Sequence, residues 1–335
     1  MVYTGALTLT QYMLQSNDPL IRAITYSMIM AGTVMQDIPF VTRRTLYANG
    51  LRFEGNLPSP TWASLNDSPV SVTSTPTPYQ EQAYMFRNKI TVDHILVMDE
   101  NQIADPRSVQ VGAALRGFTY DFNDKFINNS HVPGLGDPKS FVGLRGRIDN
   151  GTKYGVRSEN KIDGGGVVMT GSATAATFGA FCELLDQLLW SVDSPDGTGV
   201  VLYMNEQLIR RFSRLSRQFS GQGGFSTATD QLGRTTMMYQ NALIRDAGYK
   251  GDQATRIITS TETSAGVNGS DVYTSVYAVN FGPMHLSGWQ FFPLMAQDQG
   301  LDNDGIVYNV LLEWVGGLFS SHTRSIGRLF GVKMA

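Results

Sequence analysis

The residues that could perform chemistry are scattered along this chain, and two short motifs only partly match known sites. The glycine-rich stretch 164–174 resembles a phosphate-binding loop but lacks the Gly-Lys-Ser/Thr ending that supplies its main charge. The DNDG stretch 302–305 resembles part of a calcium loop, but Gly300 and Leu311 stand where ligands are needed. Its aspartates are typical of a solvated loop, with an adventitious cation as the alternative.

Histidine and cysteine are equally uninformative about catalysis. His94, His131, His285 and His322 show no HxH or HxxxH spacing. The lone Cys182 lies among apolar residues, so it is expected to be a small buried side chain without a disulfide partner. We therefore expect no catalytic residue, no metal ligand and no cofactor, and a protein that is not an enzyme.

One cluster of charge stands out on a segment with helical periodicity. Arg210, Arg214 and Arg217 recur at i, i+4 and i+7, so their side chains share one helix face. This face could form ion pairs with a neighbouring subunit, or it could simply be solvated. Phe212 and Phe219 point to the opposite, apolar face, which argues against a nucleic-acid groove with exposed aromatic residues.

The composition favours association between subunits. Of the 335 residues, 42% are hydrophobic and only 16% are charged, against about 25% charged in an ordinary soluble domain. The net charge of −3 provides no general basic surface for nucleic acid or an acidic membrane. No apolar run approaches the ~18 residues of a membrane span. These features predict a soluble, intracellular protein that buries surface between subunits.

The most distinctive segment, residues 43–98, reads as a long two-stranded arm. Aromatic and β-branched residues at 45–53 and 84–97 are typical of strands. Between them, prolines recur and Asp67 is the only charged residue of the stretch 57–78. Because an isolated two-stranded ribbon is marginally stable in water, we expect this arm to lie on a neighbouring subunit.

The remaining pattern predicts an α+β fold, because helices and strands mix without βαβ alternation. A short helix is expected within 17–29, a long one over 105–129, and two more over 181–192 and 205–219. Expected strands cover 200–204, 236–246, 255–260, 272–282 and 306–315.

The order of these segments resembles a known family. An arm, a long loop and a long helix are followed by FGAFCELLDQLL, VVLYMNEQLIRRFSRLSRQ, MYQNALIRDAG, SVYAVNFGP and LLEWVGGLFSSHTRSIGRLFG. The chain from 17 to 335 resembles the major capsid proteins of tailed bacteriophages, which have the Hong Kong 97-like fold. The specificity lies in the order of elements rather than in any short motif.

The resemblance implies a domain organisation. It consists of an N-terminal arm (1–42), an extension loop (43–98), a peripheral domain with the long spine helix (99–170), an axial domain (171–305) and a return to the peripheral domain (306–335).

The resemblance also implies function and partners. Copies of the chain would assemble as hexamers and pentamers of an icosahedral shell that encloses double-stranded DNA by confinement, without sequence-specific binding or contact with a membrane. Separate scaffolding and portal proteins, and a decoration protein, are the other expected partners. The expected location is the virion, after assembly in the host cytoplasm. Some related capsid proteins lose a long N-terminal scaffolding segment, but here the arm begins near 43 and the spine helix near 105. We therefore expect no such cleavage, and a separate scaffolding protein or none.

The loop tip is expected to make non-covalent subunit contacts through Leu57, Trp62 and Leu65. The first lysine is Lys89, so the tip lacks the lysine that cross-links some related shells. An encapsulin, which is a cargo shell of the same fold, is the nearest alternative. Another virion protein and an enzyme with a dispersed site are more distant ones.

Overall fold

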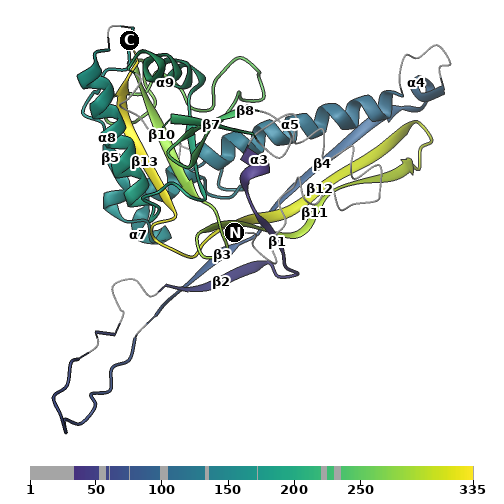
Figure 1. The fold of residues 1–335 in the computed structure, drawn as a ribbon. Helices are drawn as coiled ribbons and strands as arrows, with labels where there is room; N and C mark the ends of the chain where they lie inside the picture. Colours follow the sequence, from purple (N-terminus) through teal and green to yellow (C-terminus); the bar gives the residue numbers. More distant parts are fainter. Residues whose placement is uncertain are drawn as a thin grey trace.

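The computed structural model consists of two sheets, flanking helices and a projecting arm (Figure 1). The residues that it describes are 34–52, 58–59, 61–74, 76–98, 105–132, 136–171, 173–219, 225–229 and 235–334. The helix expected within 17–29 and the contact residue Leu57 lie outside these residues.

The described elements confirm the mixed α+β class. The helices are α3 (Val34–Asp37), α4 (His94–Met98), α5 (Pro106–Asn128), α6 (Leu144–Asp149), α7 (Gly151–Tyr154), the 3-10 turn η1 (Ser158–Asn160), α8 (Ala175–Ser191) and α9 (Glu206–Gln218). The strands are β1 (Phe40–Thr42), β2 (Tyr47–Arg52), β3 (Thr77–Gln82), β4 (Tyr84–Asp93), β5 (Lys161–Asp163), β6 (Val200–Met204), β7 (Phe225–Thr229), β8 (Thr235–Tyr239), β9 (Ala242–Asp246), β10 (Tyr273–Asn280), β11 (Leu286–Leu301), β12 (Val307–Ser320) and β13 (Ile326–Lys333).

The long helix α5 forms where the sequence predicts it. The carboxylate of Asp105 accepts a hydrogen bond from the Arg107 backbone N–H at 2.9 Å, and a proline begins the first turn. Buried Leu115, Phe118 and Phe122 recur every three or four residues. They pack the helix, about 35 Å long, along the four-stranded sheet β1-β11-β12-β4 (Figure 1).

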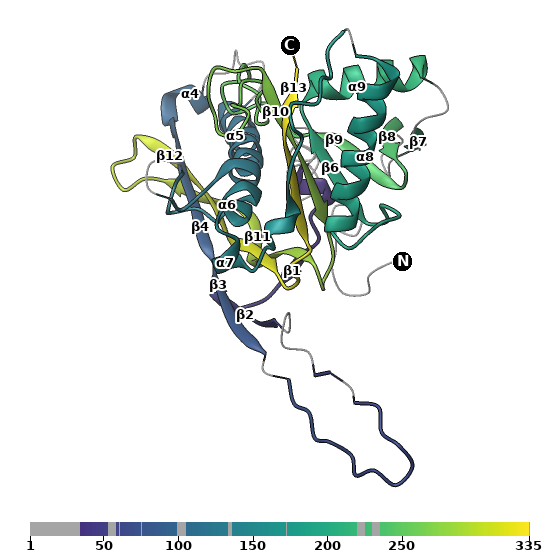
Figure 2. The ribbon, with the colours of Figure 1, turned by 90° about the vertical axis from the view of Figure 1, so that its left-hand side faces the viewer.

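The seven-stranded sheet β5-β13-β10-β6-β9-β8-β7 is covered by helices on both faces (Figure 2). Every residue of its central strand β6 is buried, and the side chains alternate between two cores. Tyr203 faces α5, where its ring lies 5.9 Å from that of Phe126. Leu202 and Met204 face the core formed with α8 and α9.

After β5 the chain crosses between the two sheets twice more. The chain passes from β10 in the larger sheet to β11 in the smaller one, and from β12 in the smaller sheet to β13 in the larger one. Residues 306–335, expected to return together to the peripheral domain, therefore divide between the sheets. The long strand β11 was expected within the axial domain, but it belongs to the sheet that carries α5.

Several expected strands need correction. The expected strand 236–246 is a hairpin of β8 and β9, turning at Gln240, whose φ is 52°. Residues 255–260 form no regular strand; Arg256 makes only an isolated bridge to Tyr249. The strands β11 and β13 were not expected, because glycines and Pro293 interrupt their alternation.

The arm pairs differently from the prediction. Strand β2 pairs with β3, with Tyr47 opposite Gln82 and Arg52 opposite Thr77. The second predicted strand, 84–97, instead contributes β4 to the four-stranded sheet, where it pairs with β12, and its last residues lie in α4. The free arm is consequently shorter than 43–98 and begins beyond the β2–β3 ribbon.

We expect Gly143→Ala to destabilise the protein by about 1–3 kcal/mol through overpacking. Gly143 precedes α6, and a Cβ atom there would lie 2.2 Å from the backbone oxygen of Lys125 and 2.6 Å from that of Phe126. Gly112→Ala is the control, because no atom lies within 4 Å of its added Cβ; it should be neutral or stabilising by up to about 1 kcal/mol. Urea unfolding of both variants measures the difference, and equal effects would contradict the packing argument.

Candidate functional site: the projecting arm and its root

The tip of the arm exposes large apolar side chains. Residues 61–74 project away from the body (Figure 1). Trp62 is 101% exposed and Leu65 is 93% exposed, so neither is covered by its own chain. The tip has a defined turn, because Asn66 has a φ of 77° and the Asp67 carboxylate accepts a hydrogen bond from the Ser64 N–H at 2.8 Å. Apolar side chains presented in this way suit contact with another protein surface.

The ribbon at the root of the arm lies on the end of β12. Tyr79 stacks on Phe319 with ring centroids 5.0 Å apart. The Arg52 guanidinium lies 3.8 Å from the centroid of the Tyr79 ring and donates a hydrogen bond to the Ser320 backbone oxygen at 3.4 Å. Gly50 allows this approach, because a Cβ atom there would lie 2.5 Å from the Tyr79 ring. These contacts hold the ribbon against the four-stranded sheet.

A buried ion pair fixes the direction of the ribbon. Arg147 of α6 donates to both carboxylate oxygens of Glu81 in β3, at 2.9 and 2.5 Å, and also to the backbone oxygens of Val142 and Leu318. Although burial by itself would lower the pKa of Arg147, the adjacent Glu81 carboxylate raises it above its ordinary value. The bidentate geometry constrains orientation as well as position. Sequence reasoning missed this pair, since its members are 66 residues apart.

The arginine face of α9 is present but separate from the arm. Arg210, Arg214 and Arg217 are exposed, as expected for one helix side. Arg210 pairs with Glu206 one turn earlier, at 3.0 Å, and the Arg217 Nε donates to a backbone oxygen of its own helix. Arg211, between them on the helix, instead donates to the backbone oxygens of residues 169 and 334 and is half-buried. The role of the exposed arginines in subunit contacts stays a prediction.

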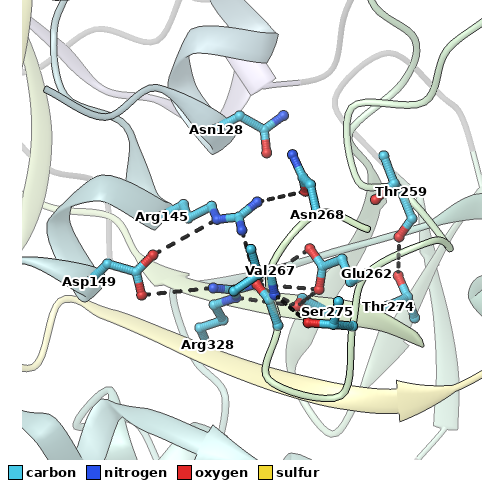
Figure 3. A network of polar contacts seen from close by, with 12 residues as sticks. Asn128, Arg145, Asp149, Thr259, Glu262, Val267, Asn268, Thr274, Ser275 and Arg328 are labelled. Carbon is cyan, nitrogen blue, oxygen red and sulfur yellow. Dashed lines mark hydrogen bonds and ion pairs between the residues drawn. The ribbon is translucent and has the colours of Figure 1, made fainter. Parts of the chain in front are cut away.

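A second polar network is sealed inside the body (Figure 3). Arg328 of β13 donates to Glu262 at 3.3 Å and to the Ser275 hydroxyl at 3.0 Å, and Ser275 in turn donates to Glu262. All three residues are at most 3% exposed. Nearby, Arg145 donates to Asn268 at 2.8 Å and so ties the same loop to α6. The serine, arginine and carboxylate satisfy one another and are closed to a substrate, so we assign them a structural role.

The other candidate residues do not converge. Asp298, Asp302 and Asp304 lie around the β11–β12 turn, and among the described residues no group of histidine, cysteine or acidic side chains could hold a metal ion. Cys182 is buried as expected, and burial raises its pKa to about 11. None of the helices in the described ranges is long and apolar enough to cross a membrane.

Two histidines meet where the chain crosses between the sheets. The ring centroids of His285 and His322 lie 5.3 Å apart, at the turns before β11 and before β13. The Nδ1 atom of His285 is buried and has no hydrogen-bond partner among the described residues. Burial lowers the pKa of His285, and His322 lowers it further, while Asp193 acts in the opposite direction. The fold therefore favours neutral His285.

We expect this histidine to make the protein less stable in mild acid. Because the folded protein binds the proton less readily than the unfolded chain, the stabilising effect is complete above the ordinary pKa of 6.5 and is lost as the pH falls below it. Melting temperatures measured between about pH 8 and pH 5 should fall less for His285→Asn than for the native protein. An identical fall in both proteins would contradict this assignment.

Comparison with known proteins identifies the fold. No protein-family model and no curated protein matches the sequence. In solved structures, the chain is similar to the SrpI encapsulin of Synechococcus elongatus PCC 7942, with 11% identity, a TM-score of 0.61, and 98% of this chain and 96% of that chain covered. It is also similar to a structure of Microbacterium phage Oxtober96 (9% identity, TM-score 0.57, 91% of each chain) and to the capsid of a native GTA particle (11%, 0.54, 90% of each chain).

The chain therefore has the Hong Kong 97-like fold found in phage capsids and encapsulins. The similarity extends over nearly the full length of the chain and of the matched proteins. The expected fold is confirmed.

Proposed function

We propose that the protein is the major capsid protein of a tailed bacteriophage. Copies assemble as hexamers and pentamers of an icosahedral shell around double-stranded DNA. The main support for the proposal is the exposure of Trp62 and Leu65 at the tip of the arm. The root of this arm is fixed to a body that has the fold of shell proteins. The contacts at the root fix the direction of the arm. The apolar side chains at its tip can be buried only against another molecule.

Assembly through such arms follows from ordinary association physics. Each arm adds contact area without enlarging the core, and a weak single contact permits correction before the shell closes. With a net charge of −3, the chain holds DNA by confinement rather than through many phosphate contacts. Scaffolding, portal and decoration proteins are the further partners we propose, with the virion as the location.

An encapsulin-type compartment is the second candidate. It is favoured by the similarity to the SrpI encapsulin, which covers 98% of the chain. We favour the phage shell on the proline-rich loop segment, which exposes two apolar side chains at its tip.

Electron microscopy of the protein, expressed alone and isolated from its native particle, tests both candidates. Uniform icosahedral shells that contain DNA in the native particle are expected. Small protein-filled shells formed on expression alone would instead support the encapsulin. Discrete monomers or dimers under both conditions would overturn the proposed function.

A further inference from the structure

One limb of the arm has the sequence of a β-strand but no strand beside it. Residues 70–74 read VSVTS, with alternating apolar and polar residues that are mostly β-branched, between Pro69 and Pro76. Val70 is 66% exposed and Val72 is 43% exposed. In the described part of the chain this limb pairs with no strand. It therefore has backbone hydrogen-bonding groups and apolar side chains available for a partner.

The body offers an unusually long free strand edge. Strand β4 ends the four-stranded sheet, and all of its ten residues pair with β12 in one unbroken register. No described strand lies along its other side. The other edge strands of the described sheets have three to six residues. A long, regular and unpaired edge is a template for one more strand.

We infer that residues 70–74 of one copy add as a strand to the free edge of β4 in a second copy. This rests on the proposed function, since it specifies how an arm docks on its neighbour. The contact is β-augmentation, in which main-chain hydrogen bonds supply affinity and alternate side chains supply specificity. Because the two surfaces differ, the contact repeats head-to-tail and can close into rings.

The arm of the same copy does not reach this edge. Glu81 and Arg147 fix the ribbon, and the arm continues away from the body, in the direction opposite to the α4 end of β4 (Figure 1). Charge does not oppose the intermolecular pairing. The limb 70–74 carries no charged residue, whereas β4 exposes Lys89 and Arg87, the latter paired with Glu313. These two cations also discourage two copies of β4 from pairing with each other.

Cysteine cross-linking between two populations of the full-length chain tests the pairing. One population carries Val72→Cys, and the other carries one cysteine in β4, placed in turn at 85, 87, 88, 89 and 91. Side chains opposite each other on neighbouring strands have Cβ atoms about 4.5–5.5 Å apart, close to the range of a disulfide. The native Cys182 is 6% exposed and its pKa is raised to about 11, so it should react little.

The expected result is a mixed disulfide whose yield at position 88 differs by about tenfold from the yields at 87 and 89, because side chains alternate between faces along β4. The Val72→Cys population alone is the control for disulfides between two arms. Native-like shells without a cross-link at any position would overturn the strand pairing and leave the proposed function standing. Absence of shells for the native chain as well would overturn both.

A proline pair gives an independent test. Val72→Pro removes a backbone donor and disturbs the preceding residue, so the protein concentration needed for assembly should rise by about tenfold or more. Ser59→Pro, at an exposed position on the other limb of the arm and outside the tip residues 62–67, should change that concentration by less than about twofold. Equal effects of the two prolines would contradict the assignment of residues 70–74 as the added strand.

Discussion

Replacing Arg147 by methionine should destabilise the subunit by about 3–5 kcal/mol, which is the usual cost of leaving one member of a buried ion pair without its partner. The side chain of Arg147 is 1% exposed and that of Glu81 is 10% exposed. The substitution also leaves the backbone oxygens of Val142 and Leu318 without this donor. Urea unfolding of the isolated subunit measures the loss, and electron microscopy reports whether shells still form.

Two controls separate the buried pair from ordinary surface charge. The double variant Arg147→Met with Glu81→Gln removes the unpaired carboxylate, so it should recover part of the lost stability. Arg87→Met breaks the ion pair with Glu313, in which the arginine is 61% exposed, and should cost less than about 1 kcal/mol. If the loss for Arg147→Met were as small as that for Arg87→Met, the ion pair would not be what fixes the arm.

The helices could be predicted because their signals are local. Asp105 and Asn205 precede helices as N-caps, and each accepts a hydrogen bond from a backbone N–H within two residues. Apolar spacing then identified the buried faces of α5, α8 and α9. The same reasoning failed for β11, whose register with β12 shifts at three places. A strand of this kind loses the strict alternation by which it would be recognised.

The root of the arm could not be predicted, because its contacts join distant parts of the sequence. Tyr79 and Phe319 are 240 residues apart, and nothing in either residue type specifies the other. The pairing of β2 with β3 was missed for a different reason, since Pro78 weakened the signal for a strand. A two-stranded ribbon tolerates proline because both of its strands are edges. By contrast, the position of Trp62 on a projecting arm could be predicted, because the proline-rich segment around it can form neither a continuous strand nor a helix.

Replacing Trp62 and Leu65 by serine should leave the subunit intact and prevent efficient assembly. Because neither side chain is buried by its own chain, the free energy of unfolding should change by no more than about 0.5 kcal/mol. If each is buried in the shell, its loss removes about 2 kcal/mol per contact. That amount raises the concentration required for assembly by about 30-fold for each residue. Light scattering across a concentration series measures this shift.

A matched variant tests whether assembly depends on the tryptophan of the arm in particular or on any exposed tryptophan. Trp190 of α8 is 66% exposed, so Trp190→Ser removes a comparable side chain from the body. We expect it to shift the assembly concentration far less than Trp62→Ser does. Unchanged assembly of the Trp62 and Leu65 variant would refute the role of the tip. A loss of assembly accompanied by a loss of subunit stability would instead mean that the arm supports the fold. The combination of a stable subunit with failed assembly is what a contact made only between copies requires.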